Sequence, residues 1–172
     1  MPTLTKLKGN DVALYGNQVN VGDKAPVVTL PNTALEEITI GGAQGKAQLI
    51  IAVPSLDTPV CATETRKFNE EAAKVENAVV CVVSMDLPFA SKRFCSTEGV
   101  ENLEVLSDYR EKTFSTSYGT LIAEGALRGL SARVVFVVDK DGIVTYKEIV
   151  PEITEEPNYE AALAALKEAA AK

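Results

Sequence analysis

The chain has 172 residues, 46% of them hydrophobic and 24% charged, which is typical of one globular domain, here residues 1–172. Its formal net charge of −7 at pH 7 disfavours nucleic acid and anionic membrane surfaces as partners. The chain contains no histidine, which excludes Ser-His-Asp hydrolases, Cys-His proteases and histidine-ligated metal centres.

The first quarter of the chain is predicted to form short strands, and it contains no candidate catalytic residue. Residues 11–21 hold two alternating runs around Gly16-Asn17, a pattern that predicts a β-hairpin at one edge of a sheet. Residues 27–30 and 37–40 are two further strand candidates. We interpret this part of the chain as framework.

Two continuous apolar runs, residues 47–53 and 78–85, have the length of strands. Runs without polar alternation are typical of strands buried on both faces, as in a parallel sheet. Between them, apolar residues recur at helical spacing, which predicts an amphipathic helix from near Ala62 and a right-handed β-α-β unit. The apolar positions of this helix are Phe68, Ala72 and Val75.

The next stretch is less regular. Residues 88–95 predict one or two helical turns, with Phe89 and Phe94 packed inward. Residues 103–106 predict a short strand and residues 111–118 a short helix.

The last third of the chain completes the predicted sheet. Residues 119–129, apolar and rich in glycine, predict a surface loop. Residues 134–138 predict a third buried strand, which a turn joins to the alternating run 143–150 in an antiparallel hairpin. A final helix is expected from about Asn158. The order β-α-β-α-β-β-α after a hairpin predicts an α/β fold, a thioredoxin-like three-layer sandwich with a mixed central sheet.

Cys61 lies where strand 47–53 gives way to a helix. There its sulfur would face the free N–H groups of the first helical turn, which together with the helix dipole favour thiolate over thiol. Thr58 would bring a hydroxyl to the same pocket, and Pro54 and Pro59 would make the loop rigid. The alternative is an inert, half-buried small hydrophobe, as most cysteines are.

The other two cysteines differ in their surroundings. Cys81 lies within an apolar strand, where burial makes a thiol inert, so we expect a structural role. Cys95 lies where a short helix ends, and it is a candidate functional residue only as a possible partner of Cys61. No pair of cysteines forms a CxxC motif, which weakens zinc-site and dithiol interpretations.

Arg133 is a lone charge at the start of the apolar strand 134–138. In the predicted topology this strand neighbours the one that leads to Cys61. A guanidinium there would hold a thiolate and donate to a substrate oxygen. The alternative is a surface arginine paired with an aspartate.

These residues resemble a known family. Pro54-x-x-x-Thr58-x-x-Cys61 resembles the P-x-x-x-T-x-x-C signature of peroxiredoxins. More closely, the segments 54–61, 86–95 and 129–133 look like motifs of the thiol peroxidase subgroup, of the atypical 2-Cys type. The likeness extends over nearly the whole chain, from the first hairpin to the last helix.

The resemblance implies a role for each candidate. Cys61 would be the peroxidatic cysteine and Cys95 the resolving cysteine, while Thr58 and Arg133 complete the pocket and Pro54 shields the sulfur. The thiolate would attack a hydroperoxide and become a sulfenic acid, which condenses with Cys95 to an intramolecular disulfide. Because a disulfide needs Cα atoms about 4.4–6.8 Å apart, we expect one or both cysteine segments to unwind on oxidation.

The resemblance also implies partners. These are hydrogen peroxide or alkyl hydroperoxides as substrate, thioredoxin as reductant and a second copy in a homodimer, with antioxidant defence as the role and no metal, flavin or haem cofactor. Residues 119–129 would line a site for larger alkyl hydroperoxides or pack against the second subunit. A redox sensor using the same cysteine pair and a purely structural domain remain alternatives, whereas a general disulfide oxidoreductase would need a CxxC motif.

The sequence further predicts a cytoplasmic protein. Its first residues, Met1 to Lys6, are too polar and too few to resemble a secretion signal. No apolar run reaches the roughly 18 residues that a membrane-spanning helix requires.

Overall fold

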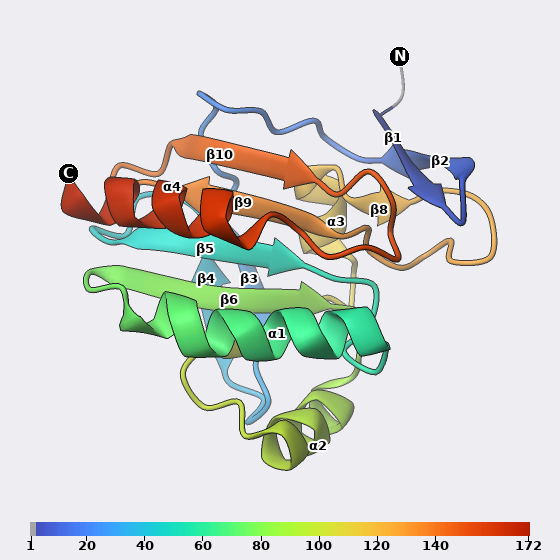
Figure 1. Cartoon of the computed structure of the whole chain (residues 1–172), viewed down its shortest axis with the longest axis horizontal. Helices are drawn as coiled ribbons and strands as arrows, with labels where there is room; N and C mark the ends of the chain where they lie inside the picture. Colours follow the sequence, from blue (N-terminus) through green and yellow to red (C-terminus); the bar gives the residue numbers. More distant parts are fainter. Residues whose placement is uncertain (1–2) are drawn as a thin grey trace.

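A five-stranded mixed sheet forms the centre of the molecule (Figure 1). In spatial order its strands are β10 (Val144–Ile149), β9 (Val134–Val138), β5 (Ala47–Ala52), β6 (Ala78–Ser84) and β7 (Glu104–Ser107). Strands β5, β6 and β7 are parallel, whereas β9 is antiparallel to both β5 and β10. The computed structural model describes residues 3–172 and confirms the predicted strands of this sheet.

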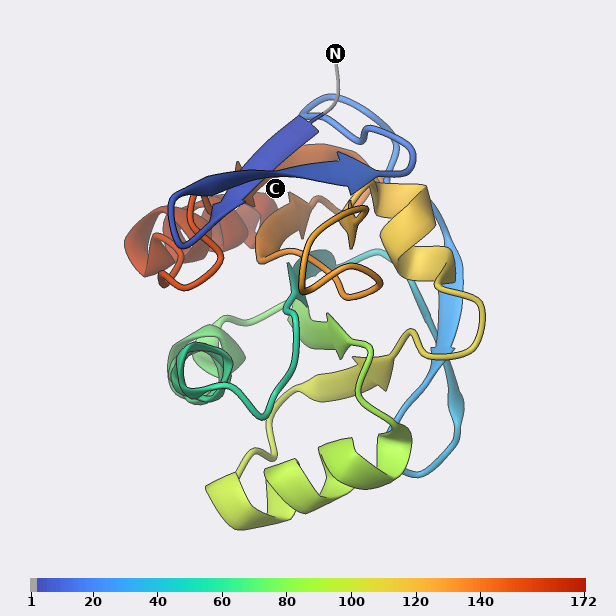
Figure 2. The same ribbon diagram turned by 90° about the vertical axis from the view of Figure 1, so that its right-hand side faces the viewer.

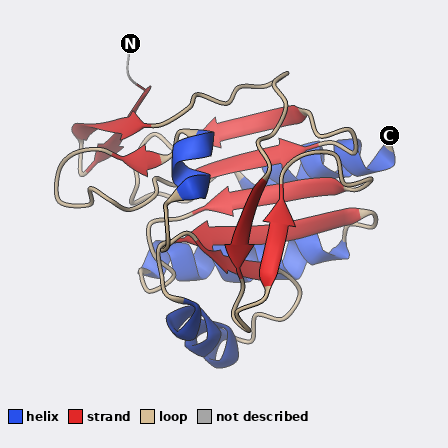
Figure 3. Cartoon of the chain, turned by 180° about the vertical axis from the view of Figure 1, so that it is seen from behind, coloured by secondary structure: helices blue, strands red, loops and turns tan. Residues whose placement is uncertain are grey.

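Helices and a hairpin complete the three layers. Helices α1 and α4 cover one face of the sheet, while α3 and the β3-β4 hairpin cover the other (Figures 1 and 3). Helix α2 lies beyond β7, at the edge of the sheet (Figure 2). The bounds are β3 (Val28–Pro31), β4 (Glu37–Ile40), α1 (Pro59–Glu71), the 3₁₀ turn η1 (Ala72–Lys74), α2 (Pro88–Glu98), α3 (Thr113–Tyr118) and α4 (Tyr159–Ala171).

The core confirms that β5 is buried on both faces, as its uninterrupted apolar run predicts. Leu49, Ile50 and Ile51 are all 0% exposed. Ile50 enters the core cluster beneath α3 and the β3-β4 hairpin, whereas Leu49 and Ile51 enter the cluster beneath α1 and α4. Burying a side chain of this size contributes about 1.5–3 kcal/mol, so this strand is a stable base for the loop that follows it.

The N-terminal hairpin exists, but the predicted position of its turn is wrong. Strands β1 (Thr3–Leu7) and β2 (Asn10–Tyr15) are joined at Lys8-Gly9. Both turn residues have positive φ, 51° and 84°, as a tight two-residue hairpin turn requires. Residues 18–21 form no strand, and β2 pairs instead with β8 (Leu121–Ile122) in a separate three-stranded sheet.

The prediction placed the hairpin turn at Gly16, but the positive φ of this glycine allows close packing against α3 instead of a hairpin turn. Its φ is 119°, and a Cβ atom at this position would lie 2.6 Å from the carbonyl oxygen of Thr116 in α3. The glycine therefore allows the chain after β2 to pass directly against α3.

Three further expectations need correction. Helix α2 extends over 11 residues, longer than the predicted one or two turns, and Phe89 on it is 69% exposed rather than packed inward. Phe94 does pack against the core. The segment 119–129 is not wholly a surface loop, since it contains β8, in which Ile122 is 1% exposed.

None of the helices between residues 3 and 172 combines the length and the apolar character needed to cross a membrane.

Candidate active site

Cys61 lies in the first turn of α1, which starts at Pro59, before the predicted start near Ala62. Thr58 is the N-cap, and its Oγ1 accepts a hydrogen bond from the backbone N–H of Cys61 at 3.3 Å. Pro59 suits the next position because the first helical N–H has no partner within the helix. The Cys61 side chain is 0% exposed, so its sulfur is enclosed at the positive end of the helix.

Arg133 brings its guanidinium to this sulfur. Its Nη1 donates to Cys61 Sγ at 3.1 Å, although the two residues are 72 positions apart in the chain. Arg133 is 2% exposed, so the alternative of a surface arginine does not hold. The contact follows from the sheet, since β5 and β9 are antiparallel neighbours that pair Ala52 with Val134. The chain thus leaves β5 toward Cys61 where Arg133 enters β9.

Glu64 is a site residue that the sequence did not reveal. It is 0% exposed, and its Oε1 accepts a hydrogen bond from Arg133 Nη1 at 2.6 Å. Burial raises the pKa of Glu64 to about 7, although Arg133 opposes this shift. Its Oε2 has no hydrogen-bond partner within residues 3–172. The only signal was its spacing, three residues after Cys61, which places both on one helix face.

The guanidinium is fixed from two sides. Arg133 Nε donates to the carbonyl oxygen of Ile153 at 3.0 Å, and the N–H of Ile153 donates to the carbonyl oxygen of Lys6 in β1 at 2.8 Å. Burial disfavours the charged arginine, but Glu64 and Cys61 outweigh it and raise the pKa of Arg133. Arg133 is therefore a permanent cation, and the N-terminal hairpin indirectly supports it.

The loop before α1 carries the remaining candidates. Pro54 is buried, two residues after the end of β5. Thr58 Oγ1 donates to the carbonyl oxygen of Ser55 at 3.2 Å while it accepts from the N–H of Cys61. The structure therefore brings Cys61, Thr58 and Arg133 together, with Pro54 at the start of the same loop.

Cys95 lies apart, near the end of α2, and is half-buried. Burial raises the pKa of its thiol. Helix α2 is tied to α1 by the ion pair between Arg66 and Glu98, at 3.1 Å, and Asn69 Oδ1 of α1 accepts from the N–H of Asn102, beyond the end of α2, at 2.9 Å. All three cysteines lie in the described part of the chain as free thiols.

Cys81 lies in β6 and is 6% exposed. Burial raises the pKa of its thiol to about 12, so it remains protonated at neutral pH. Its surroundings therefore agree with the structural role expected from the sequence.

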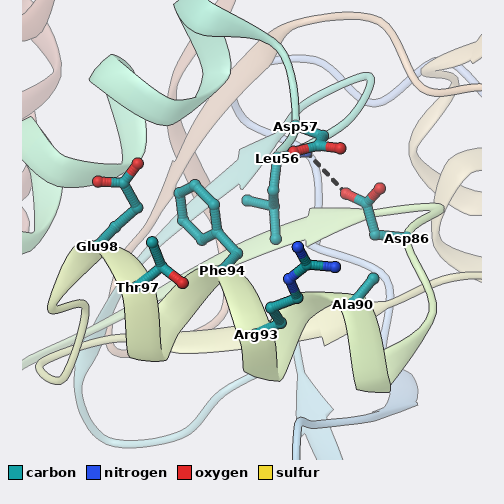
Figure 4. Close-up of a pocket in the computed structure, with 8 residues that line it drawn as sticks. All are labelled: Leu56, Asp57, Asp86, Ala90, Arg93, Phe94, Thr97 and Glu98. Carbon is teal, nitrogen blue, oxygen red and sulfur yellow. Dashed lines mark hydrogen bonds between the residues drawn. The ribbon is translucent and has the colours of Figure 1, made fainter.

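A cavity of about 310 Å³ separates the loop before α1 from α2 (Figure 4). The loop contributes Leu56 and Asp57, and the opposite wall belongs to Asp86 and α2. Its lining on the α2 side consists of Ala90, Arg93, Phe94, Thr97 and Glu98. The cavity therefore lies between the chain segments that carry Cys61 and Cys95.

Comparison with known proteins identifies the family of this chain. Residues 20–163 match the Redoxin family. The chain is 52% identical to a thiol peroxidase of Aquifex aeolicus over 98% of its length and 99% of that relative. It is 59% identical to a thiol peroxidase of Campylobacter jejuni, over 91% of this chain and 88% of the relative.

Solved structures agree with this assignment. A peroxiredoxin-like protein from Aquifex aeolicus superimposes with a TM-score of 0.93 at 53% identity, over 96% of both chains. A thiol peroxidase from Chromobacterium violaceum, 20% identical, shares the fold with a TM-score of 0.85 over 96% of this chain and 95% of that one. The chain therefore belongs to the Redoxin family and, within it, to the thiol peroxidases, enzymes that reduce peroxides with a thiol.

Proposed function

We propose that this thiol peroxidase reduces hydrogen peroxide and alkyl hydroperoxides with Cys61 as the peroxidatic and Cys95 as the resolving cysteine. The observation that supports it best is the 3.1 Å contact between Arg133 Nη1 and Cys61 Sγ at the start of α1. A buried sulfur that meets both a helix N-terminus and a guanidinium is well placed to react as a thiolate. Antioxidant defence is the corresponding biological role.

In the first step, the Cys61 thiolate attacks the terminal oxygen of the hydroperoxide. A sulfur–oxygen bond forms, the oxygen–oxygen bond breaks, and the leaving oxygen takes a proton to become water or an alcohol. Arg133 and the Thr58 hydroxyl stabilise the negative charge that develops on the oxygens. Glu64 holds Arg133 in place through the same nitrogen, Nη1, that meets the sulfur.

In the second step, the sulfenic acid on Cys61 condenses with the Cys95 thiol, which forms a disulfide and releases water. The two cysteines lie on different helices, with a cavity of about 310 Å³ between their segments, so we expect part of α1 or α2 to unwind for this bond to form. Thioredoxin then reduces the disulfide by thiol–disulfide exchange and returns both thiols.

The unit of function that we propose is a homodimer of single-domain chains in the cytoplasm. Both core clusters pack on the same central sheet, which supports one domain. The apolar side chains of Leu87 and Phe89 at the start of α2, 51% and 69% exposed, support contact with a second copy. Three free thiols suit a reducing compartment.

The test is hydroperoxide consumption coupled to a thioredoxin reducing system, with Cys61→Ser as the main variant and Cys81→Ser as its matched control. We expect turnover in the wild type and the control and none in Cys61→Ser. Wild type that forms a Cys61–Cys95 disulfide under peroxide without turnover would favour a sensor or another reductant. Full turnover in Cys61→Ser would refute the assignment of Cys61.

A further inference from the structure

The carboxylate of Asp86, two residues after the end of β6, accepts three hydrogen bonds. Its Oδ1 accepts from Ser55 Oγ at 2.7 Å, and its Oδ2 accepts from the N–H of Leu56 at 2.7 Å and from Ser84 Oγ at 2.8 Å. Figure 4 shows the Leu56 contact at the edge of the cavity. Two of the three donors belong to the loop before α1, so the carboxylate fixes that loop.

The fixed loop leads directly to Cys61. The carbonyl oxygen of Ser55 accepts from the N–H of Thr58 at 3.4 Å and from Thr58 Oγ1 at 3.2 Å. Thr58 Oγ1 in turn accepts from the N–H of Cys61 at 3.3 Å. A continuous series of hydrogen bonds therefore runs from the Asp86 carboxylate through Ser55 and Thr58 to the backbone of Cys61.

Asp86 also stands at the start of the helix that carries Cys95. It lies two residues before Pro88, where α2 begins, and its carbonyl oxygen accepts a hydrogen bond from Ser107 Oγ in β7. Only Pro88 and Ser91 of α2 are fully buried, while Phe94 and Cys95 pack against the core in part, so the helix is held to the rest of the chain along one side. The cavity of about 310 Å³ further separates it from the loop before α1.

We propose that Asp86 is a positioning residue that joins the two cysteine segments, holding the Cys61 loop in its peroxide-reactive form and opposing the opening needed for the disulfide. This inference rests on the proposed function of Cys61 and Cys95. Hydrogen bonds to an ionised carboxylate are about twice as strong as neutral ones, which suits a tie between a rigid strand end and a loop. The tie favours the first chemical step and slows the second.

The two steps can be measured separately without thioredoxin. Competition for hydrogen peroxide with a second peroxidase gives the rate constant of Cys61 oxidation. Trapping the sulfenic acid with dimedone, followed by mass spectrometry, gives the ratio of trapped sulfenic acid to Cys61–Cys95 disulfide. For Asp86→Ala we expect Cys61 oxidation to slow about tenfold or more, since the loop loses its fixed geometry. We expect disulfide formation to quicken, so the dimedone adduct decreases severalfold.

Asp86→Asn is the conservative variant. Its amide oxygen can still accept from the N–H of Leu56, and the Ser55 hydroxyl can turn to accept from the amide. We expect both rates to lie between those of wild type and Asp86→Ala. This variant also keeps the test decisive if Asp86→Ala fails to fold.

Asp108→Ala is the matched control. Asp108 is a buried carboxylate that accepts from the N–H groups of Phe114 and Ser115, both at 2.9 Å, in α3 rather than in the Cys61 loop. We expect lower thermal stability but no opposite change of the two rates. Equal loss of both rates in the Asp86 variants, or rates like those of Asp108→Ala, would overturn the proposal. Absence of Cys61 oxidation in the wild type would instead refute the proposed function itself.

Discussion

At the scale of single residues, one guanidinium nitrogen serves two acceptors. Arg133 Nη1 donates to Cys61 Sγ at 3.1 Å and to Glu64 Oε1 at 2.6 Å. The sulfur and the carboxylate therefore share the same positive charge in a site shielded from water. The protonation of Glu64 decides how much of that charge is available to the sulfur.

This shared contact makes protein stability depend on pH through Glu64. Its pKa is raised by burial to about 7, above its value of 4.5 without burial, so the unfolded chain loses this proton at lower pH than the folded chain. Raising the pH from about 5 to 8 should therefore destabilise the wild type relative to Glu64→Gln, which has no proton to lose. Thermal unfolding of both proteins across this pH range checks the expectation. Parallel curves would contradict it.

The raised pKa of the Cys95 thiol predicts that the second chemical step, disulfide formation, depends on pH. Burial raises the pKa of its thiol, so little thiolate exists at neutral pH. Disulfide formation should then quicken as the pH rises from 6 to 8, by up to about tenfold per unit where deprotonation of Cys95 limits the rate. Quenched-flow measurement of the disulfide after one equivalent of peroxide tests this. A rate independent of pH would show that helix opening, and not the thiol, is limiting.

Sequence reasoning reached part of the site at this scale. Cys61 and Arg133 could be predicted from the sequence because a cysteine at a strand–helix junction and a lone charge before an apolar strand are unusual. Thr58 could be predicted from its spacing, three residues before Cys61. Glu64 could not be predicted as a site residue, because nothing in the sequence distinguishes it, as a fully buried side chain, from the other charged residues of its helix. The contacts of Asp86 depend on which loops meet in space, and one sequence does not show that.

At the scale of elements, the buried strands were the easiest to predict. The apolar runs of β5, β6 and β9 have no polar alternation, so burial on both faces was their simplest interpretation. The hairpin turn was harder, because Gly16-Asn17 was the dipeptide with a turn sequence between two alternating runs. Lys8-Gly9 forms the turn, whereas Gly16-Asn17 had the better turn sequence. Packing of Gly16 against α3 decided between them, and this contact is not local.

Helix α2 is held at its far end by Asn69 in α1. Asn69 Oδ1 accepts from the N–H of Asn102 at 2.9 Å and from that of Glu101 at 3.3 Å, in the chain that leaves α2. Asn69→Ala should therefore increase hydrogen exchange in α2 and quicken disulfide formation severalfold, with Cys61 oxidation unchanged. Hydrogen-exchange mass spectrometry and dimedone trapping give both readouts. Slower Cys61 oxidation in this variant would mean that α2 and the Cys61 loop do not open independently.

At the scale of the whole molecule, the proposed homodimer can be tested at the exposed start of α2. Phe89 is 69% exposed, and a charge there should weaken any apolar contact with a second copy. Light scattering after size-exclusion chromatography should show a dimer for the wild type and a larger monomer fraction for Phe89→Glu. The variant Lys92→Glu, on the same helix, is a control for added negative charge. A dimer that persists unchanged in Phe89→Glu would place the interface elsewhere.

The antiparallel pairing of β5 with β9 has one more consequence, for how this fold tolerates change. The pairing of Ala52 with Val134 brings the Cys61 sulfur and the Arg133 guanidinium together, although 72 positions separate the two residues in the chain. Insertions in the exposed segment 124–126, which follows β8, should therefore be tolerated without separating sulfur from guanidinium. A slip of one residue between these strands would instead turn Arg133 toward the opposite face of the sheet. We therefore expect insertions to be tolerated in this exposed segment but not within β5 or β9.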